Sequence, residues 1–251
     1  MRMRVMAVLA MTALAVRPAA AGSTNFFRTS GQNILDTNGA SFLVRGMGLN
    51  GWLTPEAYQL QLNQVHNRHL GNASDIEQQI LNLLGTNVAD AQAFWDLYRS
   101  NYVTQADLAM LKSNGLNTVR LPFNYRLLSP SNQPGVYLDA GFGVLSNAIA
   151  WCKSNNLGVI LDLHCAPGGQ SADTPADPEF TYWATNQSGV WYEHGVACLW
   201  ETNAAAIAAT GRNPVTNRWR TVELWREIAK RFKNEKQIIG YELLNETFLP
   251  A

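Results

Sequence analysis

The sequence predicts a parallel α/β fold, a (β/α)8 TIM barrel represented by roughly its first four βα units. Short apolar runs that are typical of buried strands alternate with segments whose apolar residues recur at helical spacing. This alternation indicates a parallel sheet, because a parallel strand needs a crossover connection before the next strand. The apolar runs also end in polar or charged residues, as barrel strands do at the edge that carries the active site.

Composition narrows the class of protein. The 251 residues include 19 basic and 19 acidic side chains, so no net charge favours nucleic acid or an anionic membrane surface. Hydrophobic residues make up 47% of the chain, which is ample for a sizeable core. We therefore predict one folded domain with neither a nucleic-acid nor a membrane partner, and composition does not predict an oligomeric state.

The first 21 residues are typical of a secretory signal peptide. Arg2 and Arg4 precede an apolar segment that is too short to span a membrane, and Ala19–Ala21 supply the small residues of a cleavage site. This predicts a secreted protein, extracellular or periplasmic, whose mature barrel domain occupies residues 22–251.

The first predicted elements are a hairpin and a core strand. Short apolar pieces at 31–36 and 41–44 flank Asn38–Gly39, a strong hairpin turn signal. The second piece continues into the first core strand at 44–49, and Trp52 lies in the loop that follows.

Three helices are predicted before the second strand. Ser74–Glu77 forms a capping box that opens the first helix, which ends at Gly85. The second helix has one aromatic-rich face, made of Ala91, Phe94, Trp95 and Tyr98. The third helix opens at Thr104 and ends at Asn114–Gly115.

Three further strands follow, at 117–123, 158–164 and 238–246, and Pro122 is expected to mark the end of the first of them. The helix before 158–164 has an apolar face made of Leu145, Ala148, Ile149 and Cys152. The helix before 238–246 has an apolar face made of Trp219, Val222, Trp225, Ala229 and Phe232. The long connection at 166–214 is predicted to form a cap or wall over the site.

The predicted strand ends and their loops carry the candidate site residues Trp52, Arg120, Asn124, His164, Asn245 and Glu246. No lysine falls on a predicted strand, which argues against Schiff-base chemistry. No strand carries two histidines, and the three cysteines have neither zinc-site nor disulfide-framework spacing. A carboxylate, an amide, an imidazole and a guanidinium with aromatics nearby suit glycoside hydrolysis, in which a carboxylic acid protonates the leaving oxygen.

Four segments resemble the motifs of glycoside hydrolase family 5, the cellulase family: Val44–Leu53, Gly115–Phe123, Leu161–Gln170 and Gly240–Glu246. They occur in family order, each at a predicted strand, and they cover essentially the whole mature chain. The resemblance implies a (β/α)8 barrel enzyme that cleaves β-linked polysaccharide with retention of configuration and needs neither a metal nor a cofactor.

The resemblance also implies a role for each matching residue. Glu246 is the general acid/base, and Asn245 binds the sugar hydroxyl next to the cleaved bond. Arg120 supports the nucleophile, and His164 lines the catalytic subsite. Trp52 and Asn124 are further candidates for substrate binding.

The departure from the family pattern concerns the nucleophile. In the family this glutamate lies on the seventh strand, and only four strands are predicted here. The chain is therefore expected to be an N-terminal half that is inactive alone, poorly soluble and open at its sheet edges. Glu242 and Asp162 are predicted to point into the barrel and to pair with Arg45 or Arg120, since a buried charge needs a partner.

The function predicted from these features is a secreted retaining β-glycosidase of cellulase or endoglucanase type, present as a fragment. One alternative is a catalytically inactive carbohydrate-binding remnant. The other is an exo-glucanase or a mannanase of the same family. The sequence leaves open which β-glycan is cleaved and whether cleavage is endo or exo.

Overall fold

The computed structural model describes residues 26–62, 71–178, 181–185, 191–202, 204, 207–208 and 213–247. The predicted signal peptide lies outside these residues. Within them, no helix is long and apolar enough to cross a membrane.

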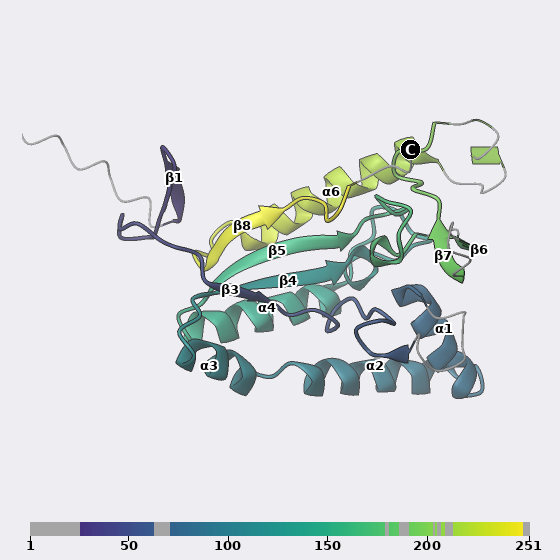
Figure 1. The fold of residues 1–251 in the computed structure, drawn as a ribbon, viewed down its shortest axis with the longest axis horizontal. Coiled ribbons are helices and arrows are strands. Elements are labelled where there is room, and N and C mark those ends of the chain that lie inside the picture. The colour runs from purple at the N-terminus through teal and green to yellow at the C-terminus, as the bar shows by residue number, and fades with distance from the viewer. Residues whose placement is uncertain are drawn as a thin grey trace, which may run out of the picture.

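The centre of the molecule is a parallel sheet of four strands, as predicted. In sheet order these strands are β3 (Gly46–Gly48), β4 (Thr118–Asn124), β5 (Gly158–Cys165) and β8 (Ile238–Glu242). Figure 1 shows them running in one direction with helices alongside. The sheet and its helices form part of an α/β barrel.

The amino-terminal hairpin differs in detail from the prediction. β1 (Arg28–Ser30) and β2 (Asn33–Leu35) pair antiparallel around a turn that precedes the expected one. The turn at Asn38–Gly39 also forms, but only a single bridge between Leu35 and Ser41 follows it, in place of a second strand. This hairpin projects from one end of the central sheet (Figure 1).

Three helices connect β3 to β4: α1 (Ala73–Leu83), α2 (Val88–Tyr102) and α3 (Gln105–Ser113). α1 begins earlier than predicted, because the Asn72 side chain accepts a hydrogen bond from Asp75 N at 2.9 Å and caps the helix in place of Ser74. At the start of α3, Asp107 accepts from both the backbone N–H and the hydroxyl of Thr104, as the capping pattern predicts.

Pro122 does not end its strand, as the sequence had suggested, but lies inside β4. The carbonyl of Arg120 accepts a hydrogen bond from Leu49 N, so β4 residues of this parity turn their backbone groups toward β3. Since β3 ends at Gly48, opposite Arg120, the position facing Pro122 has no strand to which an N–H would donate. The proline therefore costs the sheet no hydrogen bond.

One face of the sheet is packed under helices. β4 and β5 direct a fully buried apolar set toward this face: Val119, Leu121, Phe123, Val159, Leu161 and Leu163. α4 (Asp139–Ser154) covers them with the predicted set Leu145, Ala148, Ile149 and Cys152, all of which are buried. Residues of the other parity, including Arg120, Asp162 and His164, belong to the inner face, where the candidate site lies.

The final helix, α6 (Pro214–Phe232), packs through a face that only partly matches the prediction, since the predicted Phe232 is buried and Trp225 packs against the core. Its buried apolar residues are Leu224, Ile228 and Phe232, whereas the predicted Trp219 and Val222 are about half exposed. The helix is apolar on more than one side, so its spacing alone did not identify the side that meets the sheet.

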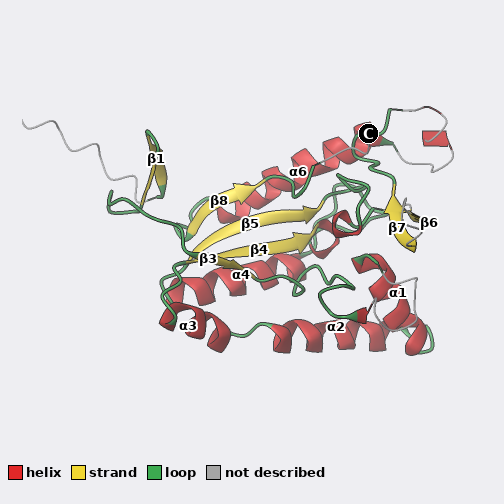
Figure 2. Ribbon diagram, viewed as in Figure 1, coloured by secondary structure: helices red, strands yellow, loops and turns green. Residues whose placement is uncertain are grey.

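The long connection after β5 contains a short helix, η3 (Thr174–Ala176), and a hairpin of β6 (Thr181–Thr185) and β7 (Trp191–Gly195). Figure 2 shows this hairpin beyond the carboxyl ends of β4 and β5, the end of the sheet at which a cap was expected.

Candidate active site

Arg120, on β4, gathers polar groups from the two neighbouring strands. Its Nε donates to Glu242 Oε2 at 2.7 Å, and its Nη2 donates to Glu242 Oε1 at 2.8 Å. The same Nη2 donates to Asn245 Oδ1 at 2.8 Å and lies 2.9 Å from Asp162 Oδ2. One guanidinium therefore orients two carboxylates and an amide on the inner face of three adjacent strands.

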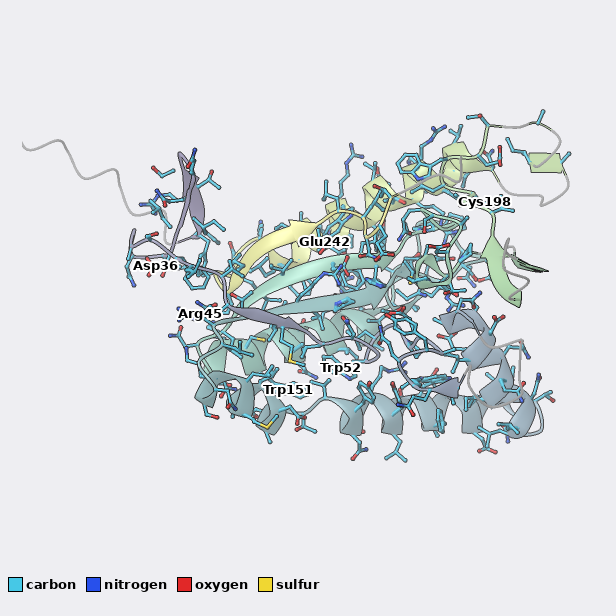
Figure 3. The ribbon with its side chains drawn as sticks, in the orientation of Figure 1. Asp36, Arg45, Trp52, Trp151, Cys198 and Glu242 are labelled. Atoms are coloured by element: carbon cyan, nitrogen blue, oxygen red, sulfur yellow. The ribbon has the colours of Figure 1, made fainter. Side chains whose placement is uncertain are left out.

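The predicted pairing of Glu242 and Asp162 is confirmed for Arg120. Arg45, the other candidate, donates from its Nε to Gly115 O and lies at the amino end of the strands, away from Glu242 (Figure 3). The hydrogen bonds with Arg120 lower the pKa of Glu242, and those with Glu242 raise the pKa of Arg120. Both groups are therefore charged at neutral pH.

His164 lies between two carboxylates. Its Nδ1 is 2.7 Å from Asp162 Oδ2, and its Nε2 is 3.6 Å from Glu56 Oε1. Burial lowers the pKa of His164, but the contacts with Asp162 and Glu56 outweigh burial and raise the pKa to about 9. The ring is therefore an imidazolium at neutral pH and presents an N–H from each nitrogen.

Glu56 is a site residue that the sequence did not reveal. It is 3% exposed and lies in the loop after β3, a stretch with no recognisable periodicity. No motif signalled it, because its role depends on where that loop returns to the sheet.

Gln170 is a second buried residue to which the sequence assigned no role, although it lies in one of the family-like segments. Its Nε2 donates to the backbone carbonyls of His164 at 2.7 Å and Asn245 at 2.9 Å. Its Oε1 accepts from Ala166 N at 3.0 Å. The amide therefore joins the ends of β5 and β8 and fixes the segment that carries Asn245.

Asn245 and Glu246 follow β8 in a turn. The Asn245 side chain is buried, and its backbone N donates to Leu163 O at 3.3 Å. Glu246 is exposed and has a left-handed backbone with φ of 41°, a conformation that is costly for a residue with a side chain. Its negative charge contributes to the raised pKa of Arg120. Within the described structure, Glu246 is the carboxylate of this group that makes no hydrogen bond or ion pair.

Trp52 and Asn124, the other two candidates, are placed outside this cluster. Trp52 is 3% exposed, donates from its Nε1 to Arg99 O at 2.7 Å and stacks on Trp151 with ring centroids 6.1 Å apart (Figure 3). Asn124 is also buried, and its Nδ2 donates to Asp177 Oδ2 at 2.6 Å. These contacts place Trp52 and Asn124 outside the Arg120 cluster, and both residues line a separate cleft beside α2.

The arrangement has the components of acid/base chemistry on a polyhydroxylated substrate. The Asn245 amide offers an N–H donor, and Glu246, the next residue in the chain, is an exposed carboxylate whose charge acts on Arg120. In the part of the chain that the structure describes, no group of three His, Cys, Asp or Glu side chains is placed to hold a metal ion.

The chain is similar to several curated glycoside hydrolases. It is 29% identical to a beta-xylosidase of Phanerodontia chrysosporium over 88% of this chain and 39% of that protein. It is 28% identical to endoglucanase C of Acetivibrio thermocellus over 66% of this chain and 39% of that protein. A protein of Aspergillus clavatus named "Probable glucan 1,3-beta-glucosidase A" is 34% identical over 53% of this chain and 31% of its own length. The chain thus spans less than half the length of each of these relatives.

Solved structures share the fold. The rutinosidase of Aspergillus niger aligns with a TM-score of 0.54 at 18% identity, over 82% of this chain and 49% of that one. An endogalactoceramidase aligns with a TM-score of 0.50 at 20% identity, over 88% and 44%. The sequence model of the family described as "Cellulase (glycosyl hydrolase family 5)" matches residues 74–250. With more than half of its residues inside that match, this chain belongs to glycosyl hydrolase family 5.

Proposed function

We propose that this chain supplies the acid/base half of the active site of a secreted, retaining β-glycosidase of cellulase or endoglucanase type that hydrolyses β-glucan. The observation that carries the proposal is the Arg120 cluster, which places Asn245, and next to it Glu246, at the carboxyl ends of the parallel strands. In a barrel this edge is where catalytic residues lie, and membership of a glycosyl hydrolase family supplies the reaction class.

In the proposed mechanism, Glu246 protonates the glycosidic oxygen as the bond to the leaving group breaks. A second carboxylate attacks the anomeric carbon, and Glu246 then removes a proton from the water that releases the covalent intermediate. The exposed position of Glu246 leaves its carboxyl oxygens accessible to both the leaving group and water.

The contacts of Asn245 determine which of its atoms is presented to substrate. Its Oδ1 accepts from Arg120, so the Nδ2 amino group remains as the donor to a sugar hydroxyl. Nδ2 lies 3.5 Å from His164 Nε2, but an imidazolium nitrogen has no lone pair with which to accept its hydrogen. The Asn245 amino group therefore keeps its hydrogens for substrate, while the two N–H groups of His164 face Asp162 and Glu56.

The nucleophile is proposed to come from residues outside these 251. Each nearby carboxylate other than Glu246 already faces a cation: Glu242 faces Arg120, Asp162 faces Arg120 and His164, and Glu56 faces His164. Asp162 and Glu56 are buried, and both oxygens of Glu242 accept from Arg120, so none of the three presents a free oxygen to the anomeric carbon. We therefore expect the 251-residue chain alone to show no turnover.

Release of reducing sugar from a soluble β-glucan tests both parts of the proposal. The 251-residue chain should give no more product than its Glu246→Gln variant. A protein from the same reading frame extended past residue 251 should hydrolyse the glucan, and Glu246→Gln should lower its kcat by roughly 10²–10⁴-fold, the usual contribution of acid/base catalysis. Turnover by the 251-residue chain that Glu246→Gln abolishes would refute the missing nucleophile, and an extended protein that binds glucan without hydrolysing it would indicate a binding remnant.

An exo-acting glucosidase is the second candidate. The glucan 1,3-beta-glucosidase relatives reach 34% identity, against 28% for the endoglucanases, although over a shorter part of this chain. Chromatography of early products separates the two, because an exo enzyme releases one small sugar from the chain end and an endo enzyme releases mixed oligosaccharides. The same assay on a mannan tests the mannanase alternative.

Secretion is proposed from the amino-terminal pattern alone. Expression in a secreting host, followed by amino-terminal sequencing of the exported protein, should find Gly22 as the first residue. Retention of Met1 on an exported protein, or failure of export, would contradict the proposal.

A further inference from the structure

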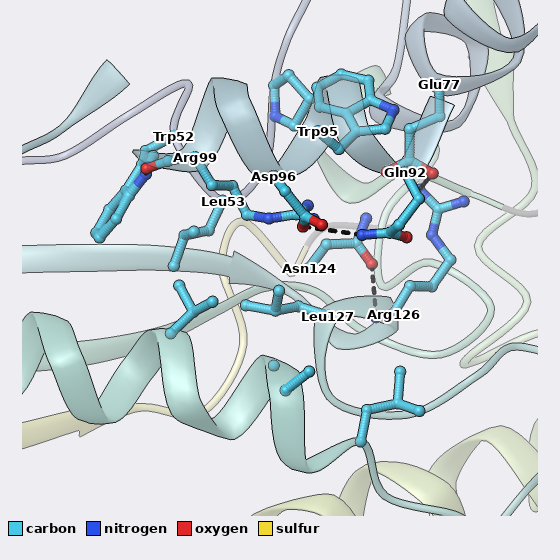
Figure 4. Close-up of a pocket in the computed structure, with 15 residues that line it drawn as sticks. Trp52, Leu53, Glu77, Gln92, Trp95, Asp96, Arg99, Asn124, Arg126 and Leu127 are labelled. Atoms are coloured by element: carbon cyan, nitrogen blue, oxygen red, sulfur yellow. Dashed lines mark hydrogen bonds and ion pairs between the residues drawn. The ribbon is translucent and has the colours of Figure 1, made fainter. Parts of the chain in front are cut away.

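A cleft of about 610 Å³ lies outside the parallel sheet, between α2 and the segment that joins β4 to α4. One wall comes from α2, and the other comes from η2 (Tyr125–Leu127) and the first turns of α4 (Figure 4). Arg120, His164, Glu242 and Asn245 do not line it, so it is separate from the proposed active site. Its volume lies within the roughly 300–1,000 Å³ of typical small-molecule sites.

The face that α2 turns toward the cleft is polar with a single aromatic. Gln92, Trp95, Asp96 and Arg99 line the cleft from positions i, i+3, i+4 and i+7, which form one stripe of a helix. Leu97, on the opposite side, is 65% exposed. α2 packs inward through Ala91, which is buried, and through Tyr98, whose hydroxyl donates to Gly51 O, so the neighbouring polar stripe is left to meet a polar occupant of the cleft.

The polar groups of the cleft keep unused hydrogen-bonding capacity. Asp96 accepts from Gln92 Nε2 and from Arg99 Nη2 through one oxygen, Oδ1. In the described structure its Oδ2 and the Gln92 carbonyl make no hydrogen bond. Arg126, across the cleft, keeps a buried Nε that has no hydrogen-bond partner in the same part of the chain.

The charges of the lining argue for a neutral ligand. Two carboxylates, Glu77 and Asp96, face two guanidinium groups, Arg99 and Arg126, and the formal charges cancel. Arg126 lies 3.2 Å from Glu77 and 2.7 Å from Asp177, which lies behind the lining, and Arg99 lies 2.9 Å from Asp96. An anion or a cation would therefore meet as much repulsion as attraction, whereas hydroxyl groups can donate to one member of each pair and accept from the other.

The remaining lining is apolar apart from Asn124, whose Nδ2 donates to Asp177 Oδ2. Trp95 contributes an aromatic ring from α2, and the facing wall contributes small and aliphatic side chains, among them Leu127, Ala140 and Val144. We infer that this cleft is a second carbohydrate-binding site, which takes a short neutral oligosaccharide with a C–H face of one sugar ring against Trp95. The inference does not depend on hydrolysis, since the site holds its ligand away from the Arg120 cluster.

Titration with cellobiose, followed by the indole N–H resonance of Trp95 in ¹⁵N NMR spectra, tests the inference. A Trp95→Phe variant assigns the resonance. Cellobiose should shift it in the wild-type chain and equally in Arg120→Ala, which alters the other site. Ala140→Phe adds a ring inside the cleft without removing a polar contact, and it should weaken binding at Trp95 at least about tenfold, a cost of roughly 1.4 kcal/mol.

Leu97→Ala, on the outward face of the same helix, is the matched control and should leave the shift unchanged. Thermal unfolding of each variant separates lost binding from lost fold. A Trp95 resonance that cellobiose does not move, or a shift that survives Ala140→Phe in a folded protein, would overturn the inference. Loss of binding in Arg120→Ala with the Trp95 shift retained would leave this inference standing and bear only on the proposed active site.

Discussion

The two helices that cover the sheet, α4 and α6, differ in how much of their apolar surface is enclosed. α4 buries its predicted apolar face against the central strands β4 and β5. α6 buries one stripe but leaves another open, and its Val222, Trp225 and Ala229 line an apolar groove of about 590 Å³ with Leu243 and Leu244. The central strands β4 and β5 thus have a neighbouring strand on each side and a helix over their apolar face, whereas the β8 edge retains apolar surface of the kind that ordinarily contacts another element.

The largest expected effects on the free energy of unfolding distinguish the buried stripes of α4 and α6 from the exposed stripe of α6. Leu145→Ala on α4 and Leu224→Ala on the inner stripe of α6 should each cost about 2–5 kcal/mol of unfolding free energy, because both side chains are fully buried. Val222→Ala, at 51% exposed, should stay within about 0.5 kcal/mol. Urea unfolding measures all three. A Val222→Ala loss as large as that of Leu224→Ala would mean that the groove is covered in solution.

The Arg120–Glu242 pair joins the central strand β4 to the edge strand β8. Its loss should lower the free energy of unfolding slightly less than the loss of a buried leucine. Arg120→Ala leaves the buried Asp162 and the partly buried Glu242 without their shared cation, which should destabilise the chain by about 3 kcal/mol. The control is Arg226→Ala, which removes an exposed pair with Glu223 on α6 and should cost about 0–1 kcal/mol. Equal effects in the two variants would show that the cluster does not hold the edge to the centre.

The buried imidazolium of His164, on the inner face of the sheet, predicts that the free energy of unfolding depends on pH. The pKa of His164 is raised to about 9 from its ordinary 6.5, so its stabilising contribution is complete below pH 6.5 and is lost as the pH rises toward 9. Between pH 6.5 and 8 the loss should be about 2 kcal/mol. This range ends below the pH at which exposed cysteines of the unfolded chain ionise. Across this pH range, the unfolding free energy measured in urea should depend less on pH in His164→Gln than in the wild-type chain. An equal pH dependence in that variant would contradict the role of the ring.

The smallest stability effect concerns the open groove itself. The isolated chain should associate through the apolar surface at β8 and α6, because unpartnered edges and apolar patches promote self-association. Val222→Lys should raise the monomer fraction in analytical ultracentrifugation and change the unfolding free energy by no more than about 0.5 kcal/mol. A wild-type chain that is already monodisperse and monomeric would argue against the open edge.

The features predicted best from the sequence are those that follow from the two-residue alternation of side chains along a strand and from the order of strands and helices. The alternation of side chains along strands placed Asp162 and Glu242 on the inner face with Arg45 or Arg120 as partner, and the structure shows that the partner is Arg120. The parallel order of the four core strands also follows from apolar runs separated by helical patterns.

The sequence predicted less well where several arrangements fit one pattern. α6 carries apolar residues on more than one side, so spacing did not reveal that Leu224 and Ile228, rather than Val222, meet the sheet. Trp52 has an aromatic ring suited equally to a core and to a sugar, and its stacking on Trp151 depends on a contact between distant segments. Glu56 had no local pattern at all.

The position of Pro122 bears on how Glu56 reaches the site. The pairing of β3 with β4 ends at Gly48 and Arg120, before Pro122, which has no N–H to donate, and the chain leaves the sheet after Leu49. It docks again at Leu53, which pairs with Phe123 and accepts from Asn124 N. Because Leu53 is held against β4, Glu56, three residues further on, lies next to His164. The proline in β4 therefore lies opposite the detour that brings Glu56 to His164 of β5.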